Sequence, residues 1–157
     1  MGDALRVVCF ELRGQELAIP IAEVRETVPM QPITRVFLTP GCLAGVFSLR
    51  GEIVPALDLA VLLGLPRTEV GDDSRIVVVA HPGGTAGIVV DRMRELRTLT
   101  GALEPPPANV TPSVAALMLG VAATETGTVR VLDTGAVLTV DALRALARPE
   151  AEEGRSS

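Results

Sequence analysis

The chain has 157 residues, of which 48% are hydrophobic and 21% are charged, and its formal net charge is −5. This length and apolar content predict a folded globular protein with a substantial core, not a disordered chain. Aromatic residues are limited to three phenylalanines. Without aromatic stacking platforms and with a negative charge, the chain is a poor candidate for binding nucleic acid.

The sequence also gives little indication of a metal site or of a membrane-spanning segment. Cys9 and Cys42 form no paired motif, and with the single histidine, His81, they cannot build a usual zinc site. We expect no metal and no cofactor. The N-terminus lacks a signal-peptide pattern, and no apolar run is long enough to span a membrane. The prediction is a soluble cytoplasmic protein without direct membrane insertion.

Short apolar runs bounded by turn residues follow one another along the chain, as is typical of strands. The predicted strands are Arg6–Leu12, Leu17–Ile21, Gly45–Leu49, Glu52–Leu57, Arg75–Ala80 and Ala86–Val90. A short segment of mixed polar and apolar residues follows around Val24 in one half and around Met93 in the other. Many short strands with frequent turn signals favour small β-barrels.

Turns and short helices separate these strands. Gly14 and Gly83 are the predicted turn glycines, because glycine adopts positive φ without steric cost. Helices are expected at Asp58–Leu63 and at Val140–Ala147, the second with Thr139 or Asp141 as its N-cap. Residues 65–74 and 100–112 are predicted to be irregular connections.

The two halves of the chain resemble each other. A shift of 69 residues aligns 6–26 with 75–95, and a shift of 75 residues aligns Gly45 with Gly120 and Asp58 with Asp133. Such self-similarity predicts two copies of one supersecondary unit, at 6–64 and 75–147, within a single domain at 5–148. The tail 149–157 is small and charged and is predicted to be disordered.

A hairpin is predicted where Arg50-Gly51 separates two strands, since X-Gly between apolar runs is a hairpin signal. The stretch Gly45–Leu59, reading GVFSLRGEIVPALDL, resembles the signature of the CheW-like family, with Ser48 where the family usually has asparagine. The resemblance covers roughly Leu5 to Leu146. It implies an all-β fold of two five-stranded Src-homology-3-like barrels around a shared apolar core, with short capping helices. The repeat boundaries need not coincide with the barrels.

The resemblance also implies a receptor-coupling site, in which Glu26 pairs with Arg50 of the hairpin turn. The residues that it assigns to this site are Val24, Glu26, Gly45, Val46, Leu49, Arg50 and Gly51. The alternative is an exposed ion pair without function. In the internal alignment Glu26 matches Glu95 but Arg50 matches Glu125, so only the first copy can form this pair.

By resemblance, the chain is a non-enzymatic adaptor in a two-component chemosensory pathway. Its implied partners are the regulatory domain of a CheA-type histidine kinase and the cytoplasmic tip of a methyl-accepting chemoreceptor. Leu17, Ser48 and Ala60 depart from the family pattern. An adaptor for surface motility or another receptor-kinase pathway therefore stays open. A regulatory fragment of a larger kinase is a further alternative, although the short N-terminal lead favours a standalone chain.

An enzymatic alternative starts from Asp133-Thr134-Gly135, which matches the catalytic turn of aspartic proteases. Only 22 residues follow Gly135, whereas retroviral-type proteases carry most of their fold after this motif. Asp133 also aligns with Asp58, which lacks the Thr-Gly. We therefore expect Asp58 and Asp133 to act as structural turn or cap residues before short helices.

Overall fold

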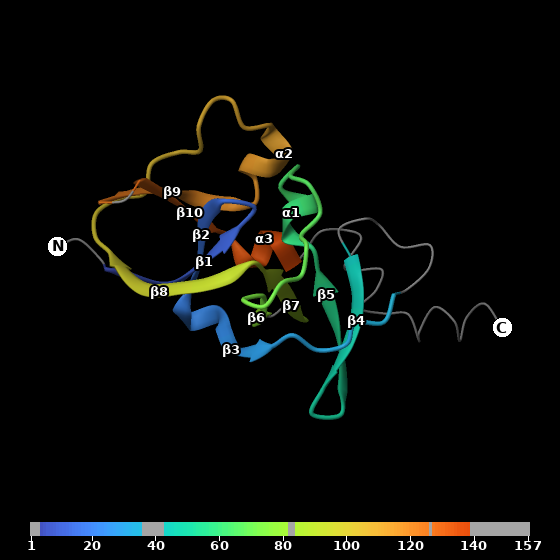
Figure 1. Ribbon diagram of the computed structural model, residues 1–157. Coiled ribbons are helices and arrows are strands. Elements are labelled where there is room, and N and C mark those ends of the chain that lie inside the picture. The colour runs from blue at the N-terminus through green and yellow to red at the C-terminus, as the bar shows by residue number, and fades with distance from the viewer. Residues whose placement is uncertain (1–3, 36–42, 82–83, 126, 139–157) are drawn as a thin grey trace.

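The computed structural model describes residues 4–35, 43–81, 84–125 and 127–138, which form two five-stranded sheets (Figure 1). The strands are β1 (Leu5–Leu12), β2 (Gln15–Pro20), β3 (Val24–Pro29), β4 (Leu43–Leu49), β5 (Glu52–Leu57), β6 (Arg75–His81), β7 (Gly84–Val90), β8 (Arg92–Leu99), β9 (Met118–Thr124) and β10 (Gly127–Leu132). The helices are η1 (Ile21–Glu23), α1 (Leu59–Leu62), α2 (Pro112–Ala115) and α3 (Thr134–Leu138). The predicted all-β class is confirmed.

Each barrel takes strands from both halves of the chain. The first barrel has the order β8-β1-β2-β10-β9, and the second has the order β3-β6-β7-β5-β4. Neighbouring strands are antiparallel except for the parallel pairs β2–β10 and β5–β7. The copies 6–64 and 75–147 therefore do not correspond to one barrel each, since β3 and β5 of the first copy pair with β6 and β7 of the second.

The internal repeat is nevertheless visible in matched backbone details. Gly45 and Gly120 have φ values of +152° and +156°. The residue after each glycine forms an isolated β-bridge with a residue earlier in the chain, Val46 with Thr34 and Val121 with Glu104. A Cβ atom on Gly45 would lie 2.3 Å from the carbonyl oxygen of Thr34, and one on Gly120 would lie 2.8 Å from that of Glu104. Glycine is required at both positions because another backbone passes too closely for a side chain.

Two hairpins close with two-residue turns of the type I′ class, which needs positive φ at both central residues. The β1–β2 turn contains Arg13 at φ +52° and Gly14 at φ +82°, and the β4–β5 turn contains Arg50 at φ +51° and Gly51 at φ +85°. The predicted turn residue Gly83 lies outside the described residues.

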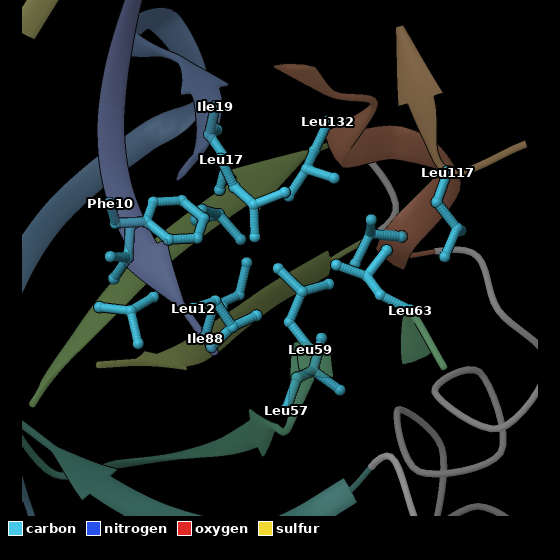
Figure 2. Close-up of a cluster of buried hydrophobic side chains, with 14 of the residues drawn as sticks. Phe10, Leu12, Leu17, Ile19, Leu57, Leu59, Leu63, Ile88, Leu117 and Leu132 are labelled. Atoms are coloured by element: carbon cyan, nitrogen blue, oxygen red, sulfur yellow. The ribbon is translucent and has the colours of Figure 1, made fainter. Parts of the chain in front are cut away.

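The largest cluster of buried side chains lies between the barrels and draws on both of them (Figure 2). Its members include, from the first barrel, Phe10, Leu12, Leu17, Ile19 and Leu132, and, from the second barrel and α1, Leu57, Ile88 and Leu59. Smaller clusters fill the interior of each barrel. The barrels are thus held together by a continuous apolar core, which burial of these side chains stabilises.

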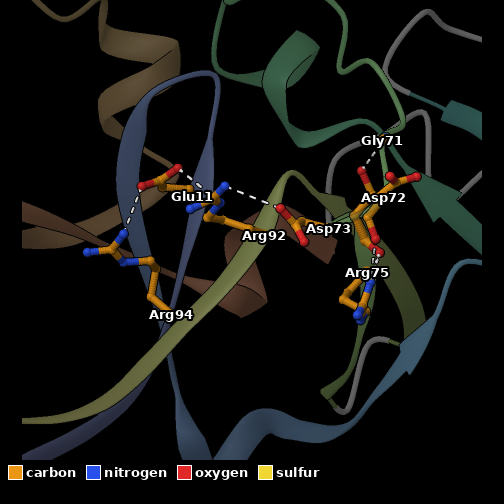
Figure 3. A network of polar contacts seen from close by, with 8 residues as sticks. Glu11, Gly71, Asp72, Asp73, Arg75, Arg92 and Arg94 are labelled. Carbon is orange, nitrogen blue, oxygen red and sulfur yellow. Dashed lines mark hydrogen bonds and ion pairs between the residues drawn. The ribbon is translucent and has the colours of Figure 1, made fainter.

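A network of ion pairs and hydrogen bonds runs along β1, β8 and the connection at 65–74 (Figure 3). Glu11 accepts a hydrogen bond from Arg94 at 3.0 Å, and Arg92 donates to Asp73 at 3.3 Å. Because Asp73 leads into β6 of the second barrel, this network joins the edge of the first barrel to the connection between the two copies.

The helices differ in part from the sequence prediction. Helix α1 lies within the predicted 58–63, whereas α2 was not predicted and begins at the end of the connection expected at 100–112, where the Thr111 hydroxyl accepts a hydrogen bond from Val114 N at 3.4 Å. The predicted helix Val140–Ala147, its candidate caps and the tail lie outside the described residues. None of the helices in the described part of the chain is long and apolar enough to cross a membrane.

Candidate functional site

The β4–β5 hairpin carries Arg50 at its tip, where the chain projects away from the body of the molecule (Figure 1). Opposite it lies Glu26 on β3, just after an irregularity in the pairing of β3 with β6. Strands β3 and β4 are the two outer strands of the second barrel. The two side chains therefore meet across the seam of that barrel.

The pair is bidentate, because both terminal nitrogens of the guanidinium reach the carboxylate. Arg50 Nη2 donates to Glu26 Oε1 at 2.7 Å, and Arg50 Nη1 donates to Glu26 Oε2. The Arg50 side chain is 70% exposed and the Glu26 side chain is 25% exposed. Planar fork-to-fork pairing fixes the orientation of both groups and leaves most of the guanidinium open to solvent.

The electrostatics of the pair follow from this geometry. The pKa of the Glu26 carboxyl is lowered, chiefly because Arg50 donates hydrogen bonds to the charged form. The pKa of Arg50 is raised by the same hydrogen bonds. Both groups are therefore charged at neutral pH, and the pair presents a fixed cation beside a fixed anion.

Apolar residues lie on the same elements as this pair, with Leu49 and Ile53 on opposite faces of the hairpin. Leu49, directly before Arg50, is half-buried against the interior of the second barrel, and Val24 is half-buried against the shared core. Ile53, on the returning strand of the hairpin, is 69% exposed. The sequence analysis did not single out Ile53; its position next to a predicted contact turn was the available signal.

The structure does not gather all the expected receptor-coupling residues in one place. Glu26, Arg50 and Gly51 lie together with Leu49, whereas Gly45 lies five residues before Arg50, or about 16 Å along an extended strand. Gly45 and Val46 instead contact Thr34: the main chain of Val46 exchanges hydrogen bonds of 2.8 and 2.9 Å with that of Thr34. Close backbone packing accounts for the glycine at position 45, and the receptor-coupling role of Gly45 and Val46 stays a prediction.

The expected cap residues behave differently from each other. Asp133 Oδ1 accepts a hydrogen bond from Ala136 N at 3.1 Å, which caps the first turn of α3. Asp58 occupies the N-cap position of α1, but its side chain does not cap the helix, because its carboxylate accepts from Thr68 N at 3.1 Å and from Thr68 Oγ1 at 3.0 Å. Asp58 is buried, and through these hydrogen bonds it anchors the connection at 65–74.

The catalytic alternatives find no support among the described residues. Asp133 is engaged as a helix cap and Thr134 is buried, so the Asp-Thr-Gly sequence starts a helix here. No group of three His, Cys, Asp or Glu in the described part of the chain is placed to hold a metal ion. Cys9 is fully buried, and burial raises the pKa of its thiol to about 11.

Comparison with known proteins agrees with this architecture. The family model described as "CheW-like domain" matches residues 6–142. The chain is 28% identical to the chemotaxis protein CheW of Bacillus subtilis over 134 residues, which cover 85% of this chain and 86% of that protein. It is 37% identical to CheW of Helicobacter pylori over 93 residues, a match that spans 59% of this chain and 56% of that protein.

Among solved structures, the scaffolding protein TtCheW of Thermoanaerobacter tengcongensis superposes with a TM-score of 0.75 at 31% sequence identity. The superposition covers 83% of this chain and 85% of that one. This likeness confirms the predicted fold of two Src-homology-3-like barrels. The chain belongs to the CheW-like family, whose members are non-enzymatic scaffolding proteins.

Proposed function

We propose that this chain is a chemosensory adaptor that couples a CheA-type histidine kinase to the cytoplasmic tips of methyl-accepting chemoreceptors. The observation that carries the proposal is the bidentate Glu26–Arg50 pair, on a CheW-like domain that spans residues 6–142. The two residues of the pair are those for which the family resemblance implies a receptor contact. An adaptor needs such a preformed surface and no catalytic group.

The receptor contact would be made by the seam of the second barrel. A helical receptor tip presents a mixed apolar and polar face, and a helix-in-groove contact uses apolar anchors with a few oriented polar groups. The half-buried Leu49 and the exposed Ile53 supply apolar surface, and Arg50 supplies an oriented donor that keeps most of its surface free. Glu26 holds the guanidinium in place for that contact.

The kinase contact would be made barrel to barrel, since the regulatory domain of CheA-type kinases is similar to this fold. Separate faces for the two partners would allow both to bind at once. The adaptor would then act by binding kinase conformations with different affinities, which is how a ligand shifts an equilibrium. Repeated modest contacts in a receptor cluster would add avidity.

The test is a binding assay with a purified CheA-type kinase and the cytoplasmic fragment of a chemoreceptor, in which wild type is compared with Arg50→Ala. We expect wild type to retain both partners and Arg50→Ala to lose the receptor while it keeps the kinase. Arg13→Ala is the matched control, because Arg13 is an exposed arginine at the same kind of turn, with φ +52°, in the first barrel. Failure of wild type to bind either partner would contradict the proposal, as would equal receptor loss in both variants.

A further inference from the structure

The seam of the first barrel, between β8 and β9, is open. These two strands end the strand order β8-β1-β2-β10-β9, and within the described residues β8 pairs only with β1. A cleft of about 590 Å³ lies along the seam and is lined by residues 95–100, 102–104 and 121–125. Its volume falls in the range of ordinary ligand sites.

Alternation of hydrogen bonds shows which backbone groups of β8 face this cleft. The β1–β2 hairpin closes at Leu12 and Gln15, so every second residue of β1 from Leu12 back to Val8 directs its main chain to β2. Val7 therefore directs its main chain to β8, where it lies opposite Arg97. By the same alternation, the N–H and C=O groups of Leu96 and Thr98 point outward into the seam.

The edge of β9 is less available. Val121 already exchanges hydrogen bonds of 2.8 and 2.9 Å with Glu104, so this position of the strand is occupied. The edge of β8 instead offers two successive outward positions beside Leu96, whose side chain is 55% exposed. An unpaired strand edge of this kind is a template for an added strand.

In the second barrel, the corresponding seam holds one carboxylate and one arginine. There the carboxylate of Glu26 receives the guanidinium of Arg50 across the two outer strands. The equivalent positions in the first barrel are Glu95 and Glu125, and both line the cleft. The same seam thus has two carboxylates where the other barrel has a carboxylate and an arginine.

The remaining charges of the cleft do not correct this imbalance. Glu104 adds a third carboxylate to the lining. Arg97, the one basic residue in the lining, is bound by Glu16 at 3.2 Å, and both side chains of that pair are largely buried. The cleft therefore favours a cationic occupant.

We propose that the β8–β9 seam binds an extended segment of a partner protein that carries arginine or lysine, which pairs as an added strand with β8. A basic side chain of the segment lies between Glu95 and Glu125, as Arg50 lies against Glu26 in the second barrel. Alternate apolar side chains of the segment contact Leu96. This site is separate from the Glu26–Arg50 pair, and the inference does not depend on the proposed function.

The test uses the full chain and a short blocked peptide in which arginine and valine alternate. Binding is followed by amide chemical shifts and by hydrogen exchange. We expect saturable binding with slowed exchange at the amides of Leu96 and Thr98. A peptide of the same sequence with one N-methylated valine keeps the charge but loses a backbone donor, and it should bind roughly fivefold or more weakly.

The decisive variant is Glu125→Arg, which recreates in the first barrel the charge pair of the second. It should weaken peptide binding on the order of tenfold, whereas Glu52→Arg, an exposed charge reversal in the other hairpin, should leave binding unchanged. Amide spectra of each variant check that the fold is kept.

Four results would overturn the proposal. The N-methylated peptide could bind as well as its parent, which would reduce the effect to general charge attraction. The perturbed amides could lie away from β8, or no saturable binding could occur at millimolar peptide. Sedimentation could also show that the chain dimerises through β8, which would assign this edge to a second copy.

Discussion

Glu26 receives two hydrogen bonds from one guanidinium, and its pKa is lowered in consequence. A carboxyl group whose pKa is lower in the folded state stabilises the fold above the pKa that it has in the unfolded chain. This contribution to stability is lost as the pH falls through the pKa of the folded state. We expect an NMR titration of Glu26 to show a midpoint below the ordinary 4.5. Arg50→Ala should return it toward that value, and Arg13→Ala should not. An unchanged midpoint in Arg50→Ala would contradict the assigned cause.

The thiol of Cys9 also has a shifted pKa. Its thiol is fully buried, and burial raises its pKa to about 11 from an ordinary value of 9.0. In a Cys42→Ser background, we expect almost no reaction with a thiol reagent at neutral pH until the chain is unfolded. Because only the unfolded chain ionises between pH 9.0 and about 11, the contribution of this group to stability is complete below pH 9.0 and is lost as the pH rises through that window. Rapid labelling of the folded protein would contradict this.

The sequence predicted the partner of Glu26 but not the partner of Asp58. The Glu26–Arg50 pair is present in the structure, although its receptor role stays a prediction. For Asp58 the sequence context resembled a helix N-cap, yet the carboxylate binds Thr68, ten residues later. The choice between these partners depends on the path of the connection at 65–74, which local sequence does not encode.

At the level of the elements, a comparison of Gly45, before a β-bridge, with Gly14, in a hairpin turn, separates the cost of backbone conformation from the cost of packing. Gly45→Ala places a Cβ atom 2.3 Å from a carbonyl oxygen, whereas Gly14→Ala meets nothing within 4 Å, although both glycines have positive φ. We expect Gly14→Ala to cost about 1 kcal/mol of unfolding free energy from conformation alone. Gly45→Ala should cost about 3 kcal/mol or more, because the clash adds to that term. Denaturant unfolding measures both, and equal losses would contradict the close approach.

The outer strands β3 and β8 were not predicted as strands, in contrast to the outer strand β4. The strands at 6–12, 45–49 and 75–80 were predicted because their runs are apolar, and the structure has strands there. Strand β8 reads RMRELRTL and is mostly exposed, so its pattern carries charge where a strand is usually recognised by apolar alternation. Charged residues on an outer strand limit unwanted pairing with other strands. The same charges interrupt the apolar alternation by which a strand is recognised in a sequence.

For the molecule as a whole, the repeat could be read from the sequence but the barrels could not. The aligned glycines and the 69-residue shift identify two copies. Which strands pair is decided by contacts such as β2 with β10, which join residues more than a hundred positions apart. Local propensity cannot rank such non-local pairings, whereas the family resemblance supplied the two-barrel arrangement.

The shared core predicts that the two barrels unfold together. Leu17 in β2 and Ile88 in β7 belong to one buried cluster although they lie in different barrels. Leu17→Ala should therefore cost about 2–5 kcal/mol, and it should lower hydrogen-exchange protection of β1 and β7 by the same amount. Val70→Ala is the matched control, because Val70 is 61% exposed and its truncation should change stability by less than about 0.5 kcal/mol. Loss of protection confined to the first barrel would mean that each barrel is stable without the other. Coincident loss would mean that a partner bound to one barrel can change the stability of the other.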